Sequence, residues 1–87
     1  MGGPKRVSEP SPELLALARR LRQMRRAREL SQEALAALAG LHPKHLSEIE
    51  RANKDPRSTT VIRIADALGV SVAELYGDAG EPAGRGG

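Results

Sequence analysis

The order of apolar and polar residues along the chain predicts a series of short α-helices and no β-strand. Apolar residues recur every three or four positions, which is the spacing of one face of a helix, and they do not alternate as in a half-buried strand. Serine or proline begins most of these segments and glycine follows several of them, as expected at helix starts and ends. The expected helices cover residues 12–28, 32–39, 43–51, 59–68 and 72–76.

Local signals mark the start of the expected helices. Ser11, Ser31 and Ser58 are expected to cap the first, second and fourth helices, because a serine oxygen can accept from a free backbone N–H group. Ser71 and Glu74 have the spacing of a capping box at the fifth helix. The side chains expected to face the core are Leu14, Leu17, Leu21, Met24, Leu35, Ala36, Ala39, Leu46, Ile49, Val61, Ile64, Ala65, Leu68, Val72, Leu75 and Tyr76.

The composition favours one small all-α domain. The 87 residues are too few for a second domain, and Tyr76 is the only aromatic residue, which disfavours a β-sandwich. The chain has no cysteine, which excludes a disulfide framework and a thiolate metal site. It has no apolar run that could span a membrane and no signal-peptide core, so we expect a cytoplasmic location and no membrane association.

Glycine, proline and polar residues dominate both ends of the chain. Residues 1–11 are expected to form a flexible N-terminal arm and residues 77–87 a disordered tail, because such segments bury little apolar surface. The folded domain is expected to cover residues 12–76, with no small-molecule effector domain beside it.

Positive charge is concentrated in the middle of the chain, although the net charge is only +3. Residues 19–63 hold eleven Lys or Arg against five Asp or Glu, and six of the arginines lie between Arg19 and Arg28. Such a cluster is either a solvated helix face or the electrostatic footprint of a polyanion, of which nucleic acid is the usual example.

The second and third expected helices have the layout of a helix-turn-helix unit, with Gly40 in the short turn between them. In the third helix, Leu46 and Ile49 are expected to point inward. Lys44, Glu48 and Arg51 then lie on the opposite side, with Ser47 on its flank. A polar outer face of this kind suits the base edges of a DNA major groove, but it also suits plain exposure to solvent.

Arg25 falls inside the apolar stripe of the first helix, about 40° from Leu21. A buried guanidinium needs an acceptor, and Glu50 is tilted inward in the same way on the third helix. We therefore predict an Arg25–Glu50 ion pair that fixes the third helix against the first. The alternative is that Arg25 extends to solvent and Glu50 lies at the rim.

Residues 17–76 resemble the lambda-repressor-like, Xre/Cro-type helix-turn-helix family. The resemblance is carried by "LRQMRRARELSQEALAALAGL", "LSEIERANKDP" and "IADALGVSVAELY", in the family's order and spacing. It implies a compact five-helix DNA-binding domain that binds double-stranded DNA, usually as a homodimer on a palindromic operator, and controls transcription. The Arg25–Glu50 pair has a counterpart in several members of the family.

The resemblance also implies roles for individual residues. The positions that match base-reading residues are Pro43, Lys44, Ser47 and Glu48. The positions that match phosphate-binding residues are Gln32, Arg51, Asn53, Lys54 and Arg57. We expect a homodimer joined through the C-terminal part of the domain, around Ile62, Glu74 and Tyr76.

Two positions depart from the family pattern. Ala52 stands where the family often has glycine, so Asn53 is expected to take the left-handed turn one residue later. Pro43 stands where many members carry a polar base-reading side chain, and it can offer only apolar contact, for example with a thymine methyl group.

Other functions find less support in the sequence. His42 and His45 are three residues apart, but no third metal ligand is in view, so we expect no metal or other cofactor. His42 is better explained as a helix cap, and His45 as a flanking or phosphate-contacting residue. No nucleophile motif accompanies the polar residues, so we expect no enzyme activity. The alternative function is an antitoxin or adaptor whose helix-turn-helix domain mainly binds a partner protein.

Overall fold

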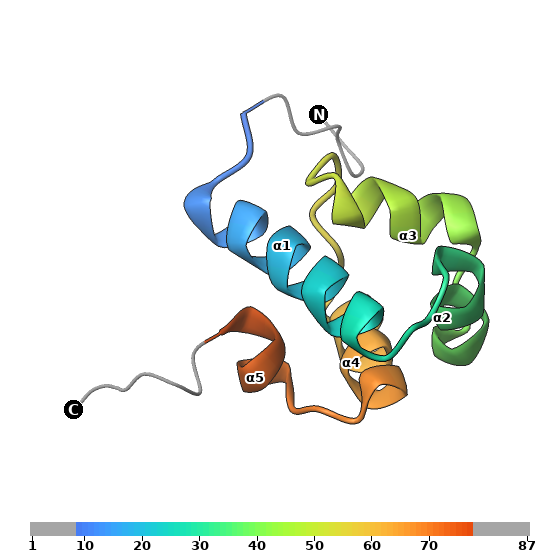
Figure 1. Ribbon diagram of the computed structural model, residues 1–87. Coiled ribbons are helices and arrows are strands. Elements are labelled where there is room, and N and C mark those ends of the chain that lie inside the picture. The colour runs from blue at the N-terminus through green and yellow to red at the C-terminus, as the bar shows by residue number, and fades with distance from the viewer. Residues whose placement is uncertain (1–8, 78–87) are drawn as a thin grey trace.

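The computed structural model describes residues 9–77, and in this range the chain forms five helices and no strand. The helices are α1 (Pro12–Ala27), α2 (Gln32–Ala39), α3 (Pro43–Glu50), α4 (Ser58–Leu68) and α5 (Val72–Tyr76) (Figure 1). The predicted all-α, five-helix fold is thus confirmed. Helices α1 and α3 are each one residue shorter than expected because residues 28 and 51 are their C-caps. The predicted arm and tail lie outside the described residues, except for residues 9–11 and 77.

The long helix α1 connects the two sides of the fold. It packs against α3 on one side and against α5 on the other, while α2 packs against both α3 and α4 (Figure 1). Within residues 9–77, no helix combines the length and the apolar character that a bilayer crossing requires.

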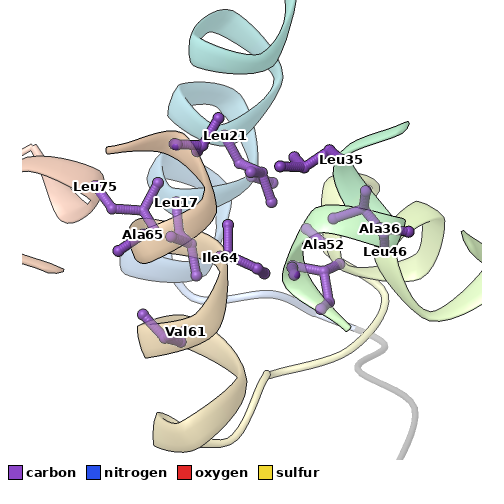
Figure 2. Packing of buried hydrophobic residues seen from close by; sticks show 14 of the residues in the cluster. Leu17, Leu21, Leu35, Ala36, Leu46, Ala52, Val61, Ile64, Ala65 and Leu75 are labelled. Atoms are coloured by element: carbon purple, nitrogen blue, oxygen red, sulfur yellow. The ribbon is translucent and has the colours of Figure 1, made fainter. Parts of the chain in front are cut away.

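Leucine, isoleucine, valine and alanine side chains from all five helices fill one core. Figure 2 shows Leu21 and Leu35 approaching from different helices, with Ile64 beside them. Burial of this apolar surface is the main force that holds such short helices together. Val72 and Tyr76 were expected in the core but remain 37% and 40% exposed, because α5 is a single turn and only Leu75 faces inward fully.

Most of the predicted caps are present. The side chains of Ser11 and Ser31 accept from backbone N–H groups, and Ser71 and Glu74 form the capping box of α5. The expected cap of α4 by Ser58 is wrong. The N-cap is Arg57, whose backbone is extended and whose side chain makes no capping bond, so that Ser58 is already helical.

The chain leaves α3 through a left-handed residue at Ala52 (φ 58°), and the expectation that Asn53 would take this turn is wrong. The N–H of Asn53 donates to the carbonyl of Glu48 at 2.9 Å and that of Ala52 to the carbonyl of Ile49 at 3.0 Å, which is the Schellman pattern. This pattern fixes the left-handed position at residue 52. The strain of about 1 kcal/mol is offset in part because the Ala52 methyl group is buried, 2% exposed.

Arg20 and Arg22 of α1, and its C-cap Arg28, donate to carbonyl groups at the C-terminal ends of three other helices. Arg20 binds the carbonyl of Glu74 on α5 at 2.8 Å, and Arg28 binds that of Leu68 on α4 at 2.9 Å. Arg22 binds the carbonyl of Glu50 on α3. Carbonyls at these ends carry the negative end of the helix dipole, and those of Glu50 and Leu68 lie in the last turn, where the helix itself supplies no donor. The carbonyl of Glu74 also accepts from the N–H of Gly77 at 3.0 Å. Part of the arginine cluster therefore stabilises the fold. The sequence had suggested only a solvated helix face or a surface for a polyanion.

Candidate nucleic-acid interface

A sharp turn separates α2 from α3. Gly40 ends α2 in the left-handed conformation (φ 71°, ψ 34°), and the N–H of Leu41 closes the turn on the carbonyl of Ala36 at 2.8 Å. His42 is the N-cap of α3, and its Nδ1 atom accepts from the backbone N–H of Lys44 at 3.1 Å. With eight residues each, α2 and α3 depend on their neighbours for stability.

The predicted pair of Arg25 and Glu50 forms at the inner side of α3. Arg25 Nε donates to Glu50 Oε2 at 2.6 Å and Nη2 donates to Oε1 at 3.0 Å, in the bidentate geometry favoured for guanidinium and carboxylate. The Glu50 side chain is 1% exposed and the Arg25 side chain 11%. The hydrogen bond to Glu50 is the main cause that raises the pKa of Arg25, and burial opposes it.

Glu50 also binds a residue of α2 that the sequence did not assign to this cluster. Gln32 Nε2 donates to Glu50 Oε1 at 3.0 Å, and Arg25 Nη1 donates to the carbonyl of Leu30 at 2.8 Å, just before α2 begins. The carboxylate of Glu50 therefore joins α1, α2 and α3. This buried cluster of Arg25, Gln32 and Glu50 fixes the orientation of α3 from its inner side. The sequence did single out Gln32 as the first residue of α2, but that position fits a phosphate contact equally well.

The outer side of α3 carries most of the predicted base-reading residues. Lys44 is exposed, and Pro43 and Ser47 are half-buried, so none of the three is enclosed in the protein interior. Arg51 follows them with a side chain that is 61% exposed. Lysine, serine and arginine side chains here can donate hydrogen bonds to acceptors on a molecule that approaches this face.

Glu48 does not lie on this face as predicted. Glu48 is 7% exposed, and its Oε1 atom has no hydrogen-bond partner among residues 9–77. Oε2 lies 3.8 Å from Arg51 Nη2. The prediction used only the angle of Glu48 around an isolated helix. The burial of Glu48 also depends on the segments that pack around α3. The expectation that Glu48 is available to accept from a base is therefore wrong for this structure.

The remaining predicted phosphate-binding residues follow α3. Asn53 and Lys54 are half-buried and Arg57 is exposed. Lys54 and Arg57 line a cleft between α3 and the start of α4, together with His45 and Arg63. The structure thus brings Lys54 and Arg57 together with His45, which the sequence indicated as a flanking or phosphate-contacting residue, and with Arg63, which the sequence did not single out.

The residues expected at a dimer interface lie on α4 and α5. Ile62 is 55% exposed on α4, and Tyr76 lines a shallow hollow against Pro12 and Ala16 of α1. Burial raises the pKa of Tyr76, and the nearby Asp55 adds to this shift. Glu74 is exposed, but its carboxylate already accepts from the backbone N–H of Ser71.

The order of the helices, the turn at Gly40 and the outward face of α3 define a helix-turn-helix DNA-binding domain. The helix-turn-helix domain family matches residues 16–75, and the chain belongs to this lambda-repressor-like family. Among curated proteins it is similar to the control protein C.SmaI of Serratia marcescens, with 39% identity over 59 residues, 68% of this chain and 70% of the relative. It is also similar to the immunity repressor protein of Bacillus phage phi105, with 33% identity over 74% of this chain and 44% of the repressor.

Solved structures show the same fold. The restriction-modification controller protein C.AhdI from Aeromonas hydrophila superposes with a TM-score of 0.72 at 34% identity, covering 75% of this chain and 98% of that protein. The biofilm master regulator SinR, solved in complex with DNA, superposes with a TM-score of 0.64 at 32% identity, covering 68% of this chain and 95% of SinR. Both are regulators, and the second was solved with DNA bound.

Proposed function

We propose that this chain is a cytoplasmic, non-catalytic transcription regulator that binds a palindromic operator in double-stranded DNA with α3 in the major groove. The observation that carries the proposal is the contrast between the two sides of α3. Its inner side is fixed by the buried cluster of Arg25, Gln32 and Glu50, and its outer side presents Lys44 and Ser47. A major groove of about 12 Å admits a helix presented in this way.

The exposure of each side chain supports a specific role. Lys44 is the strongest candidate to read a base, since lysine donates to guanine acceptors in the major groove. Pro43 can contact a thymine methyl group and Ser47 can donate to a base edge. The phosphate contacts come from Arg51, Asn53, Lys54 and Arg57, and from the backbone at Gln32, where the positive end of α2 favours an anion.

Selection of bound duplexes from a random pool tests this function, followed by fluorescence anisotropy against the selected and a scrambled duplex. A regulator is expected to prefer the selected duplex by about a thousandfold or more and to lose affinity steeply as salt rises. Weak binding without sequence preference would contradict the proposal. It would favour the alternative, an antitoxin or adaptor that mainly binds a partner protein.

We further propose that the chain binds its operator as a homodimer, with Ile62 and Tyr76 in the interface. Large apolar side chains that are half exposed are typical of such contacts. Replacement Ile62→Asp is expected to weaken self-association by at least about tenfold, because a charge would be buried against an apolar partner surface. Sedimentation velocity at tens of micromolar measures this change.

The matched control for the dimer is Leu38→Asp. Leu38 is 63% exposed on α2, a helix that holds none of the proposed interface residues, and its replacement should leave self-association unchanged. A wild-type protein that sediments only as a monomer would contradict the dimer, and so would equal effects of the two substitutions.

A further inference from the structure

The last helix, α5, is anchored in the core by a single side chain. With five residues it is too short to be stable by itself, and Leu75 is its only buried residue. Its capping box joins the helix only to its own start. One buried side chain fixes where α5 lies but leaves rotation about that side chain open. A second contact must therefore set the direction in which the exposed side chains of α5 point.

Arg20 of α1 provides this second contact. Its Nε and Nη2 atoms both donate to the carbonyl oxygen of Glu74, at 3.1 and 2.8 Å. Because the guanidinium group is planar, two bonds to one oxygen define a direction as well as a distance. Ala16 lies one turn earlier on the same side of α1, where it lines a shallow hollow together with Tyr76. This side of α1 therefore holds α5 in one orientation.

Gly77 allows the Arg20 side chain to come this close. Gly77 ends α5 in the left-handed conformation (φ 82°), and its N–H donates to the same carbonyl of Glu74 at 3.0 Å. A Cβ atom at residue 77 would lie 2.8 Å from Cδ and 3.2 Å from Nε of Arg20, so a larger residue would displace the arginine. Gly69 ends α4 in a similar conformation (φ 75°), but a Cβ atom there would meet nothing within 4 Å.

The same helix α1 also holds α3. Arg22 donates to the carbonyl of Glu50, and Arg25 donates to its carboxylate. At about 100° per residue, Arg20 and Arg22 project about 200° apart and thus to nearly opposite sides of α1. Figure 1 shows α1 between α3 and α5. One continuous helix of 16 residues therefore connects α5 to the helix that enters the major groove in the proposed function.

We propose that Arg20 and Gly77 are positioning residues that set the distance between the two α3 helices of the dimer, and with it the spacing of operator half-sites that the protein accepts. This inference rests on the proposed function, including a homodimer with Tyr76 in its interface. In such a dimer, α5 and α1 of each copy link the interface to α3. Half-sites on one face of the duplex lie about 34–36 Å apart, so one extra base pair moves a half-site by about 3.4 Å and turns it by about 35°. Rotation of α5 against α1 changes which spacing fits both copies.

The test compares a single half-site with three palindromes, one at the selected spacing and two with one base pair more or less. Fluorescence anisotropy at constant salt gives each affinity. Wild-type protein is expected to bind the selected spacing about a hundredfold more tightly than the half-site, and to lose most of this gain at the other spacings. Arg20→Gln should keep the half-site affinity but bind the three palindromes within about threefold of one another. Arg20→Lys, which keeps a donor for the carbonyl but not the planar fork, should be intermediate.

A second pair of variants tests the contact without removing a charge. Gly77→Ala is expected to reproduce the loss of spacing preference, because its methyl group displaces Arg20. Gly69→Ala is the matched control, since it places the same strain at a left-handed residue but contacts no side chain, and it should retain the preference. Arg19→Gln removes an exposed charge from the position next to Arg20 and should also retain it. Far-ultraviolet circular dichroism confirms that each variant is folded.

The outcomes separate this inference from the proposed function. If Arg20→Gln kept the spacing preference, or weakened all three palindromes by the same factor, the inference would be overturned and the proposed function would stand. Equal loss of the preference in Gly77→Ala and Gly69→Ala would also overturn it, since backbone strain would then be the cause. A wild type that bound the palindrome no better than the half-site would overturn the dimer together with this inference. Absence of sequence-specific binding by the wild type would overturn the proposed function as a whole.

Discussion

Replacement of Glu50 by alanine is expected to lower the free energy of unfolding by about 3–5 kcal/mol. The Glu50 carboxylate is the partner of the Arg25 guanidinium, and without it a charge that is nine-tenths buried has lost both of its carboxylate bonds. Gln32 loses its acceptor at the same time. Because small domains are stable by only about 5–15 kcal/mol, this loss is a large fraction of the total stability.

Urea unfolding followed by circular dichroism measures this loss. Glu13→Ala is the matched control, since Glu13 is an exposed carboxylate in the first turn of α1 and its removal should cost under about 1 kcal/mol. The double variant Arg25→Met with Glu50→Met should recover most of the stability, because removing both charges leaves neither unpaired. A Glu50→Ala variant within about 1 kcal/mol of the wild type would show that the buried cluster does not hold α3.

Replacement of Lys44 by alanine is expected to reduce the preference for the selected duplex over a scrambled one by about tenfold or more, with little change in binding to the scrambled duplex. Lys44 is exposed at the start of α3, and a good contact to a base edge contributes about 1–3 kcal/mol of discrimination. Competition binding with both duplexes in the same buffer measures the preference directly.

Lys54→Ala is the control for this experiment. It removes the same charge from the loop after α3, where a phosphate contact is expected, so it should weaken binding to both duplexes by a similar factor. If Lys44→Ala also weakened both equally, Lys44 would be a phosphate contact and the base-reading role would be wrong.

The sequence was sufficient for the features that repeat over several residues. Helix positions, the turn at Gly40 and most of the core follow from periodicity and from start and stop signals. The pair of Arg25 and Glu50 followed from a simpler argument, because two opposite charges inside apolar stripes need one another. These predictions succeeded because each depends on a local pattern or on one unavoidable energetic cost.

The errors concern positions where tertiary contacts decide the outcome. Ala52 takes a left-handed conformation that its residue type disfavours, because the Schellman bonds at the end of α3 fix the register and the methyl group is buried. Glu48 is buried although its helical angle points outward. Gln32 had two plausible partners, and only the position of α3 relative to α2 brings its amide to Glu50. No single-sequence pattern contains that relative position.

The arginines of α1 and its C-cap that bind the ends of α3, α4 and α5 have a further consequence for kinetics. A guanidinium bonded to a neutral carbonyl keeps its full charge, so Arg20, Arg22 and Arg28 still add to the field that attracts a polyanion from a distance. Some of their donors are occupied, however, and a contact with DNA that drew Arg22 or Arg28 away would release the carbonyl of Glu50 or Leu68. These charges should therefore speed the encounter with a duplex more than they prolong the lifetime of the complex, which depends on side chains that are free to bond.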